Sequence, residues 1–170
     1  MEKNIKLSLM EGKKINDVVI TVIIVKDGKY LITQRSMQEE RWPGKWTVPG
    51  GRLHSEDYEL RPKDTVNAWY NVLDDVLRKE VKEEVGLEIK NVEYATSMVA
   101  EYGDKYSLII SMMADYESGD VKLQEGESDD YVWVTVEEAK KYDLIDGIYH
   151  EIVLADSKIK GVKTGWKKSN

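Results

Sequence analysis

The chain of 170 residues contains no cysteine, which excludes disulfide bridges and zinc sites built from thiolates. It has no apolar run near the roughly 20 residues that a membrane-spanning helix needs. The N-terminal stretch MEKNIKLSLMEGKKIND is charged throughout and lacks the apolar core of a signal peptide. We therefore expect a cytoplasmic protein that has no membrane partner.

An excess of positive charge is absent as well. The 25 Lys and Arg residues are outnumbered by 32 Asp and Glu residues, giving a formal net charge of −7. This balance argues against binding to a nucleic acid polymer. It allows a small anionic ligand, because a bound cation can reverse the local sign of charge. The five lysines of the tail, residues 158–170, predict a solvated, partly ordered terminus, with a phosphate-binding arm as the alternative.

The length and the 41% hydrophobic content predict a single domain over residues 1–170, with a core at about 18–157 and a basic tail at 158–170. A β-branched run from Val18 turns at Asp27-Gly28, which predicts a β-hairpin. Further strands are expected at 87–102, 105–117 and 129–136, and helices between Pro62 and Gly86, at 137–143 and at 145–160. The pattern predicts an α/β (α+β) fold with a mixed central sheet and helices on both faces.

The segment RKEVKEEVGLEI, residues 78–89, concentrates acidic side chains on one short helix. At about 100° per residue, Glu80, Glu83 and Glu84 fall within about a third of the helix circumference. They flank an apolar stripe formed by Leu73, Leu77, Val81 and Val85. Partly desolvated carboxylates repel one another, and this raises their pKa values unless a cation lies between them.

Two explanations fit this cluster. Mg²⁺ or Mn²⁺ prefers oxygen ligands and would neutralise the three carboxylates. Alternatively, Lys79 and Lys82 neutralise them on a solvated helix face, and the helix alone favours this second explanation. The loop WTVPGGRLHSED shifts the balance, because two consecutive glycines after a proline let the backbone approach a ligand closely.

Together the two segments resemble the signature of the Nudix hydrolases. That signature is Gly, five residues, Glu, seven residues, then Arg-Glu-apolar-x-Glu-Glu-x-Gly-apolar. Gly51 followed by Asp57 resembles the first part, and KEVKEEVGL, residues 79–87, matches the second part at every specified position except the first. The family's Trp-x-x-Pro-Gly-Gly is present at residues 46–51, and the resemblance covers about residues 18–139.

The sequence departs from the signature in three respects. Asp57 replaces a glutamate, and Lys79 replaces an arginine whose planar fork can bind two carboxylate oxygens. The separation of Asp57 and Lys79 is 22 positions, against 8 in the signature, so about 14 residues are inserted. The inserted residues, Tyr58–Asn71, are expected to form a short excursion followed by extra helix.

The resemblance implies an α/β/α sandwich and an enzyme that cleaves the pyrophosphate linkage of a nucleoside diphosphate derivative with Mg²⁺ or Mn²⁺. Carried over by position, the implied metal ligands are the Gly50 carbonyl, Glu80, Glu83 and Glu84. The implied catalytic residues are Glu83, Glu84 and Glu127, with Glu125 as the alternative to Glu127. The implied substrate-binding residues are Arg35, Gly51, Arg52, Trp46 and Tyr102, and other aromatic candidates for base stacking are Trp42, Trp69 and Tyr106.

The sequence leaves several alternatives open. The expected partner is a small nucleotide, dinucleotide or nucleotide sugar, and a homodimer is plausible by resemblance to the family. Because Asp57, Lys79 and the insertion could each weaken catalysis, a catalytically weak Nudix-fold module that binds or senses nucleotides is the second hypothesis. An isomerase of this fold that uses a catalytic cysteine is excluded, since the chain has none.

Overall fold

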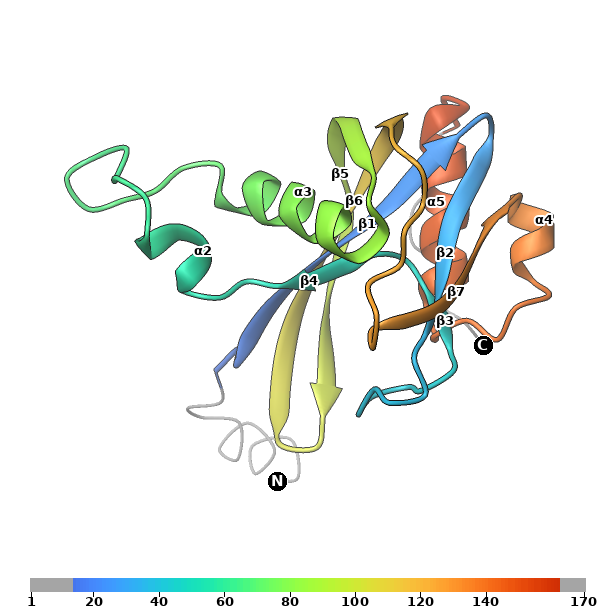
Figure 1. The fold of residues 1–170 in the computed structure, drawn as a ribbon, viewed down its shortest axis with the longest axis horizontal. Coiled ribbons are helices and arrows are strands. Elements are labelled where there is room, and N and C mark those ends of the chain that lie inside the picture. The colour runs from blue at the N-terminus through green and yellow to red at the C-terminus, as the bar shows by residue number, and fades with distance from the viewer. Residues whose placement is uncertain (1–13, 163–170) are drawn as a thin grey trace, which may run out of the picture.

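The computed structural model describes residues 14–162, which form a seven-stranded mixed sheet with helices on both faces (Figure 1). In chain order the elements are β1 (Asp17–Lys26), β2 (Lys29–Arg35), β3 (Trp46–Thr47), β4 (Gly50–Arg52), α2 (Glu56–Glu59), α3 (Val72–Val85), β5 (Glu88–Tyr102), β6 (Lys105–Ser118), β7 (Ser128–Val134), α4 (Val136–Ala139) and α5 (Ile148–Ile159). The main strand order is β3-β2-β1-β6-β5, with β4 paired to β1 and β7 paired to β2. The predicted fold class is confirmed.

The β1–β2 hairpin forms at the predicted turn. Asp27 and Gly28 both have positive φ angles, 51° and 73°, as a two-residue turn between strands of right-handed twist requires. Strand β1 then pairs in parallel with β6, from Asp17 opposite Ser107 to Val25 opposite Asp115. This central parallel pair makes the sheet mixed and gives β1 a buried position between its neighbours.

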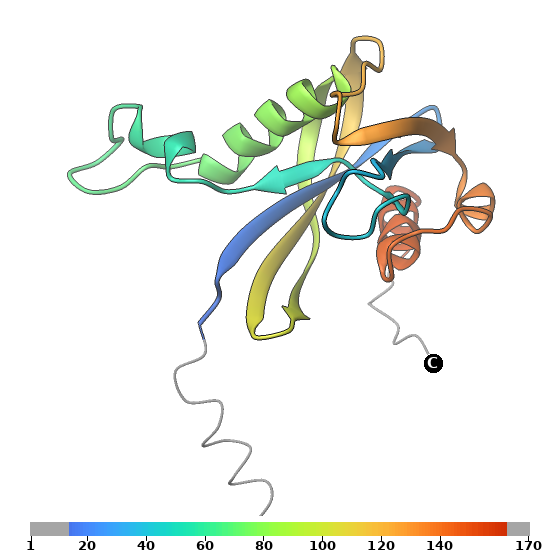
Figure 2. The ribbon, with the colours of Figure 1, turned by 60° about the horizontal axis from the view of Figure 1, so that its bottom comes forward.

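The sheet separates two hydrophobic cores, because successive side chains of a strand point to opposite faces. Ile20, Val22 and Ile24 of β1 pack with Val81 and other residues of α3 on one face. Ile23 packs on the other face with residues of α5. Figure 2 shows α3 and α5 on opposite sides of the strands. In the predicted apolar stripe of α3, Leu77, Val81 and Val85 are buried and Leu73 is half-buried, which fixes the direction in which the neighbouring glutamates point.

The expectation of a helix directly after Pro62 is wrong. The Asp64 side chain accepts a hydrogen bond from the backbone N–H of Tyr70 at 2.8 Å, and the Asp64 N–H donates to the Ala68 carbonyl at 3.0 Å. These bonds close a turn in place of capping a helix. Asn71 has a left-handed φ of 57°, so α3 begins only at Val72. The insertion thus contains the last two residues of the short helix α2 and a loop that projects from the body of the protein (Figure 1).

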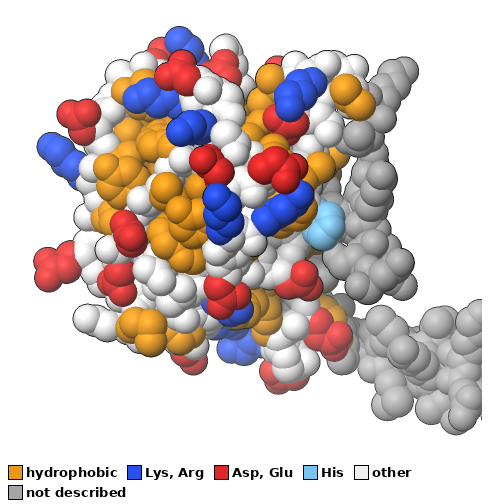
Figure 3. All heavy atoms as spheres, turned by 90° about the vertical axis from the view of Figure 1, so that its right-hand side faces the viewer, with side chains coloured by type: hydrophobic (Ala, Val, Ile, Leu, Met, Phe, Trp, Pro, Cys, Tyr) orange, Lys and Arg blue, Asp and Glu red, His pale blue; other side chains and the backbone are white. Residues whose placement is uncertain are grey.

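The C-terminal third completes the second face. Thr135 and Glu138 form a reciprocal capping box that starts α4. The buried Tyr30 hydroxyl donates to Asp156 of α5 at 2.8 Å, which ties β2 to the last helix. The face viewed from the side of α4 and α5 mixes hydrophobic side chains with both signs of charge (Figure 3).

No helix within residues 14–162 is long and apolar enough to cross a membrane. Residues 163–170 of the predicted tail, like residues 1–13, lie outside the described range.

Candidate active site

The Gly-Gly segment lies directly against the acidic helix. Strand β4 places Gly51 opposite Ile20 of β1, with α3 packed across it. The backbone N–H of Gly50 donates to Oε2 of Glu84 at 2.8 Å, and the Glu84 side chain is almost fully buried. The bend and the helix, which are 34 positions apart in sequence, are therefore in direct contact.

The two glycines are required by space. A Cβ atom on Gly51 would overlap the carboxylate of Glu80 and would lie 2.7 Å from its Cγ atom. A Cβ atom on Gly50 would overlap the Ile20 carbonyl and lie 2.7 Å from the Cα atom of Thr21. The missing side chain of Gly51 thus makes room for a glutamate, whereas that of Gly50 makes room for the neighbouring strand.

A third carboxylate comes from the segment between β6 and β7. The final carbonyls of α3 accept backbone N–H groups of that segment, from Lys122 to Val85 and from Gln124 to Glu84, each at 3.0 Å. These bonds satisfy groups that a helix C-terminus leaves unpaired. Glu127 follows, held by its carbonyl to the Ser36 N–H at 2.8 Å and by its carboxylate to Gln124 Nε2 at 3.1 Å.

The pKa values of three glutamates show that they share one electrostatic environment. Burial raises the pKa of Glu84 to about 8, and the Gly50 N–H offsets this only in part. Burial likewise raises the pKa of Glu80 and of Glu127, and the charge of Glu127 contributes to the rise at both Glu80 and Glu84. The Arg35 guanidinium lowers the pKa of Glu84 and of Glu127, so it lies within reach of the same cluster.

The two departures from the signature are paired with each other. Lys79 Nζ lies 2.9 Å from Oδ1 of Asp57, and Oδ2 of Asp57 accepts the His54 N–H at 2.8 Å. Burial raises the pKa of Asp57, but these two donors outweigh it and hold the value below the ordinary one. The ammonium group also lies 3.6 Å from Glu80 and 3.9 Å from Glu83. Lys79 therefore orders the first turn of α2 against the acidic face of α3.

The other acidic candidates separate by exposure. Glu83 is 54% exposed and lies on the solvent side of the cluster. Glu125 is exposed, whereas Glu127 is half-buried beside Arg35 and its ion-pair partner Glu39. The geometry therefore favours Glu127 over Glu125. Sequence reasoning missed Glu39, because a glutamate pair in an irregular loop carries no distinguishing pattern.

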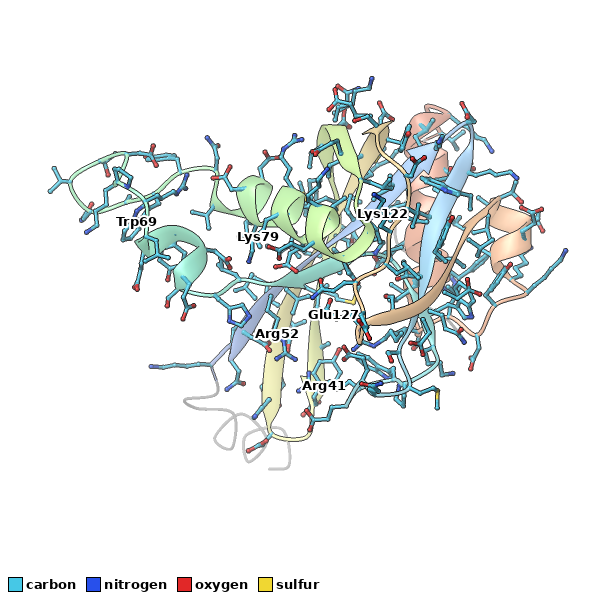
Figure 4. The ribbon with its side chains drawn as sticks, viewed as in Figure 1. Arg41, Arg52, Trp69, Lys79, Lys122 and Glu127 are labelled. Carbon is cyan, nitrogen blue, oxygen red and sulfur yellow. The ribbon has the colours of Figure 1, made fainter. Side chains whose placement is uncertain are left out.

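Two of the expected substrate-binding residues, Arg52 and Tyr102, lie close enough for their side chains to interact. Arg52 follows Gly51 directly and lies 3.5 Å from Asp17, and Tyr102 at the end of β5 contacts Trp42 and Arg41. Figure 4 shows Arg41, Arg52 and Glu127 on the same side of α3.

Trp46, also expected to contact substrate, instead packs on the opposite face of the sheet. Its ring lies 4.8 Å from that of Tyr142, within the core beneath α5, because the side chain of this β3 residue points away from α3. Trp69 packs against Tyr58 in the insertion, at 5.1 Å, far from Glu127 (Figure 4). Trp46 and Trp69 therefore do not join the cluster.

The donor chemistry suits a hard divalent cation. The cluster offers carboxylate oxygens and a backbone segment with no nitrogen or sulfur donor, the set that Mg²⁺ and Mn²⁺ prefer. Within residues 14–162, no three acidic or histidine side chains are arranged tightly enough to hold a metal ion. The physical reason is visible in their partners: Glu84 is turned to the Gly50 N–H and Glu80 toward Lys79.

The fold places the chain in a known structural class. It is similar to the MutT protein from Methanosarcina mazei Go1, with a TM-score of 0.65 at 24% identity, covering 87% of this chain and 98% of that one. It is also similar to the NUDIX domain of Shewanella oneidensis NrtR, whose structure was solved in complex with ADP ribose, with a TM-score of 0.66 at 16% identity, covering 94% and 99%.

Sequence comparison gives the family. A family model described as the NUDIX domain matches residues 14–153, and the chain belongs to the Nudix hydrolase family. It is 26% identical over 132 residues to the NAD-capped RNA hydrolase NudC of Chromobacterium violaceum, which covers 78% of this chain but only 43% of that protein. It is 26% identical over 137 residues to the nucleoside triphosphatase NudI of Klebsiella pneumoniae, covering 74% of this chain and 86% of that one.

Proposed function

We propose that the protein is a hydrolase that cleaves the pyrophosphate linkage of a nucleoside diphosphate derivative with the help of Mg²⁺ or Mn²⁺. The observation that carries the proposal is the contact of Glu80 and Glu84 with the Gly50-Gly51 bend, beside a third carboxylate whose pKa is also raised. Such clustering of perturbed acids is typical of catalytic sites. The names of the relatives agree, since a nucleoside triphosphate and ADP ribose both contain phosphoric anhydride bonds.

In the proposed site, Glu80, Glu83, Glu84 and the Gly50 carbonyl would hold the cation. The ion would neutralise charge on the diphosphate and lower the pKa of water. Glu127 accepts a proton from the attacking water. The water oxygen forms a bond to one phosphorus while the bridging P–O bond to that phosphorus breaks, and the other phosphate leaves with the bridging oxygen. The raised pKa of Glu127 is closer to neutral pH than that of an ordinary glutamate, and a general base works best when its pKa lies near the working pH. Lys79 and Asp57 position Glu80 from outside the reacting centre.

The test is hydrolysis of a panel of nucleoside triphosphates, dinucleoside polyphosphates, ADP ribose and nucleotide sugars with Mg²⁺ or Mn²⁺. We expect turnover of at least one substrate and its loss in Glu84→Gln. Glu127→Gln should lower kcat by about 10²-fold or more, whereas Glu125→Gln, a matched change two residues away on an exposed side chain, should have little effect. Absence of turnover on the whole panel by folded protein would reject the proposal.

The second candidate is a module that binds nucleotides without hydrolysing them. Lys79 favours it, because an ammonium 3.6 Å from Glu80 and 3.9 Å from Glu83 competes with a cation for the same carboxylates. Tight binding of ADP ribose without turnover in Mg²⁺ or Mn²⁺ would support this module over the enzyme. The homodimer and the cytoplasmic location stay predictions.

A further inference from the structure

A group of aromatic and basic side chains lies next to the acidic cluster and has no part in the chemistry proposed above. The rings of Trp42 and Tyr102 meet edge to face with centroids 5.3 Å apart. The Arg41 guanidinium lies 4.5 Å from the centre of the Tyr102 ring. We call Arg41, Trp42, Tyr102 and Arg52 the aromatic platform. Its members come from the β2–β3 loop, the end of β5 and the end of β4.

The backbone around Trp42 is held in an unusual conformation by its turn. Trp42 has a left-handed φ of 52°, a conformation that is costly for a bulky residue and persists only where its surroundings impose it. Those surroundings are the backbone bonds of its turn, from the Lys45 N–H to the Trp42 carbonyl at 3.2 Å and from the Gly44 N–H to the Arg35 carbonyl at 3.0 Å. Although it is held in this way, the Trp42 side chain remains 38% exposed. The chain thus holds the backbone of Trp42 in place and leaves part of this aromatic residue exposed to solvent.

The platform is joined to the acidic cluster on two sides. Arg52 follows Gly51, the residue that makes room for Glu80. Arg35 acts on the pKa of Glu84, and its Nε atom donates to the Arg41 carbonyl at 2.8 Å. A ligand whose diphosphate occupied the acidic cluster through a cation would therefore extend its remaining part over the platform.

Polar groups for recognition lie beside the rings. Asp17 and Arg52, separated by 3.5 Å, both act on the pKa of Tyr102, which burial raises and Arg41 lowers. Oδ1 of Asp17 is buried and makes no hydrogen bond among the described residues. Because that oxygen is buried, Asp17 contributes its negative charge beside the rings and no direct contact to a bound ligand. Arginines supply cationic surfaces for π-systems and donors for phosphate.

We propose that the aromatic platform binds the base of the substrate, with Trp42 as the stacking residue, so that the site selects nucleotides over diphosphates that lack an aromatic base. The inference deepens the proposed function and rests on it for the position of the diphosphate. A base has a flat π-face that stacks on an exposed indole whatever its hydrogen-bonding edge. Selection by the platform is therefore for the presence of a base, whichever base it is.

The experiment compares AMP with ribose 5-phosphate by isothermal titration calorimetry. The two ligands share the ribose and the phosphate and differ by the base, and neither contains an anhydride bond to be cleaved. We expect wild-type protein to bind AMP at least about tenfold more tightly than ribose 5-phosphate, in line with base–aromatic stacking. Trp42→Ala should remove most of this preference, and Trp42→Phe should retain much of it.

The matched control is Tyr94→Ala, which removes another exposed aromatic ring from β5, near Lys158 and eight positions along the strand from Tyr102. It should leave the AMP preference unchanged. For any nucleotide that is hydrolysed, Trp42→Ala should raise KM with little change in kcat, because the base does not enter the reacting centre.

The outcomes separate this inference from the proposed function. Equal affinities for AMP and ribose 5-phosphate, or an AMP preference that survives in Trp42→Ala, would overturn the platform even in an active hydrolase. An AMP preference that depends on Trp42 in a protein without turnover would support the platform and reject the hydrolase.

Discussion

The ammonium group of Lys79 lies 2.9 Å from Oδ1 of Asp57, so the two positions at which the chain departs from the Nudix signature contact each other across 22 residues. The pair keeps one positive and one negative charge where the signature has arginine and glutamate. The Asp57 side chain is only 5% exposed, and it therefore depends on its donors. Each substitution taken alone is a departure from the signature. Taken together, the two residues keep an ion pair between these positions.

Removing the ammonium group should destabilise the protein. In Lys79→Ala the nearly buried Asp57 carboxylate keeps only the His54 N–H, and we expect a loss of about 1 kcal/mol in the free energy of unfolding, kept small because Lys79 is half exposed. Urea denaturation measures the change. Lys82→Ala is the control, because its ion pair with Glu88 is half exposed at both ends and should contribute almost nothing. Equal losses in the two variants would contradict the structural role of Lys79.

The metal-free protein should become less stable as pH rises through the pKa of Glu84. That pKa is about 8 in the folded state against 4.5 ordinarily, so the folded protein holds a proton that the unfolded chain releases. Between pH 6 and pH 9, wild type should lose about 3 kcal/mol relative to Glu84→Gln, which cannot ionise. Chemical denaturation at several pH values measures this difference, and Mg²⁺ should restore stability at pH 9 in wild type only. A difference between the two proteins that does not vary with pH would contradict the burial of this carboxylate.

Alanine at the two adjacent glycines should have different consequences. In Gly50→Ala the new Cβ meets backbone atoms of β1, which cannot move alone, and we expect a loss of stability of about 2 kcal/mol or more. In Gly51→Ala it meets the end of the flexible Glu80 side chain, which can turn away, so activity should fall while stability changes little. Thermal unfolding and hydrolysis assays on both variants separate the two effects. Loss of stability in Gly51→Ala equal to that in Gly50→Ala would show that Glu80 does not yield.

Phenylalanine at position 30 tests the link between the sheet and the last helix. Tyr30→Phe removes the 2.8 Å hydrogen bond to Asp156 while keeping the buried ring, and the expected cost is about 1 kcal/mol. Asp156 retains Lys160 as an ion-pair partner, which limits the penalty. The free energy of unfolding from urea titration checks the value, with an unchanged midpoint counting against a contribution from this bond.

The sequence predicted the features that depend on local patterns. The Asp27-Gly28 turn, the strands that followed and the buried stripe of α3 came from turn chemistry and periodicity, and the structure has them. The prediction of a helix after Pro62 was wrong because an aspartate that can cap a helix can equally close a turn, as Asp64 does. No local pattern distinguishes the two, since the outcome depends on Asn71 and on contacts with α2. That residues 1–170 form a single domain stays a prediction.

The candidate site was predictable in part. The glutamates of α3 and the glycine bend were found from spacing, whereas their separation from Trp46 depends on which face of β3 points to α5. A two-residue strand carries no period from which that face can be read. Arg41 and Glu39 were missed for a similar reason, because their roles arise from a loop whose course is set by contacts distant in sequence.

The backbone bonds from Lys122 and Gln124 to the end of α3 fix the position at which the segment leading into β7 begins. Because those two anchor points are fixed, the number of residues between Gln124 and β7 sets where Glu127 lies. A one-residue deletion there should therefore lower activity more than Glu125→Gln, which leaves Gly126 and Glu127 in place.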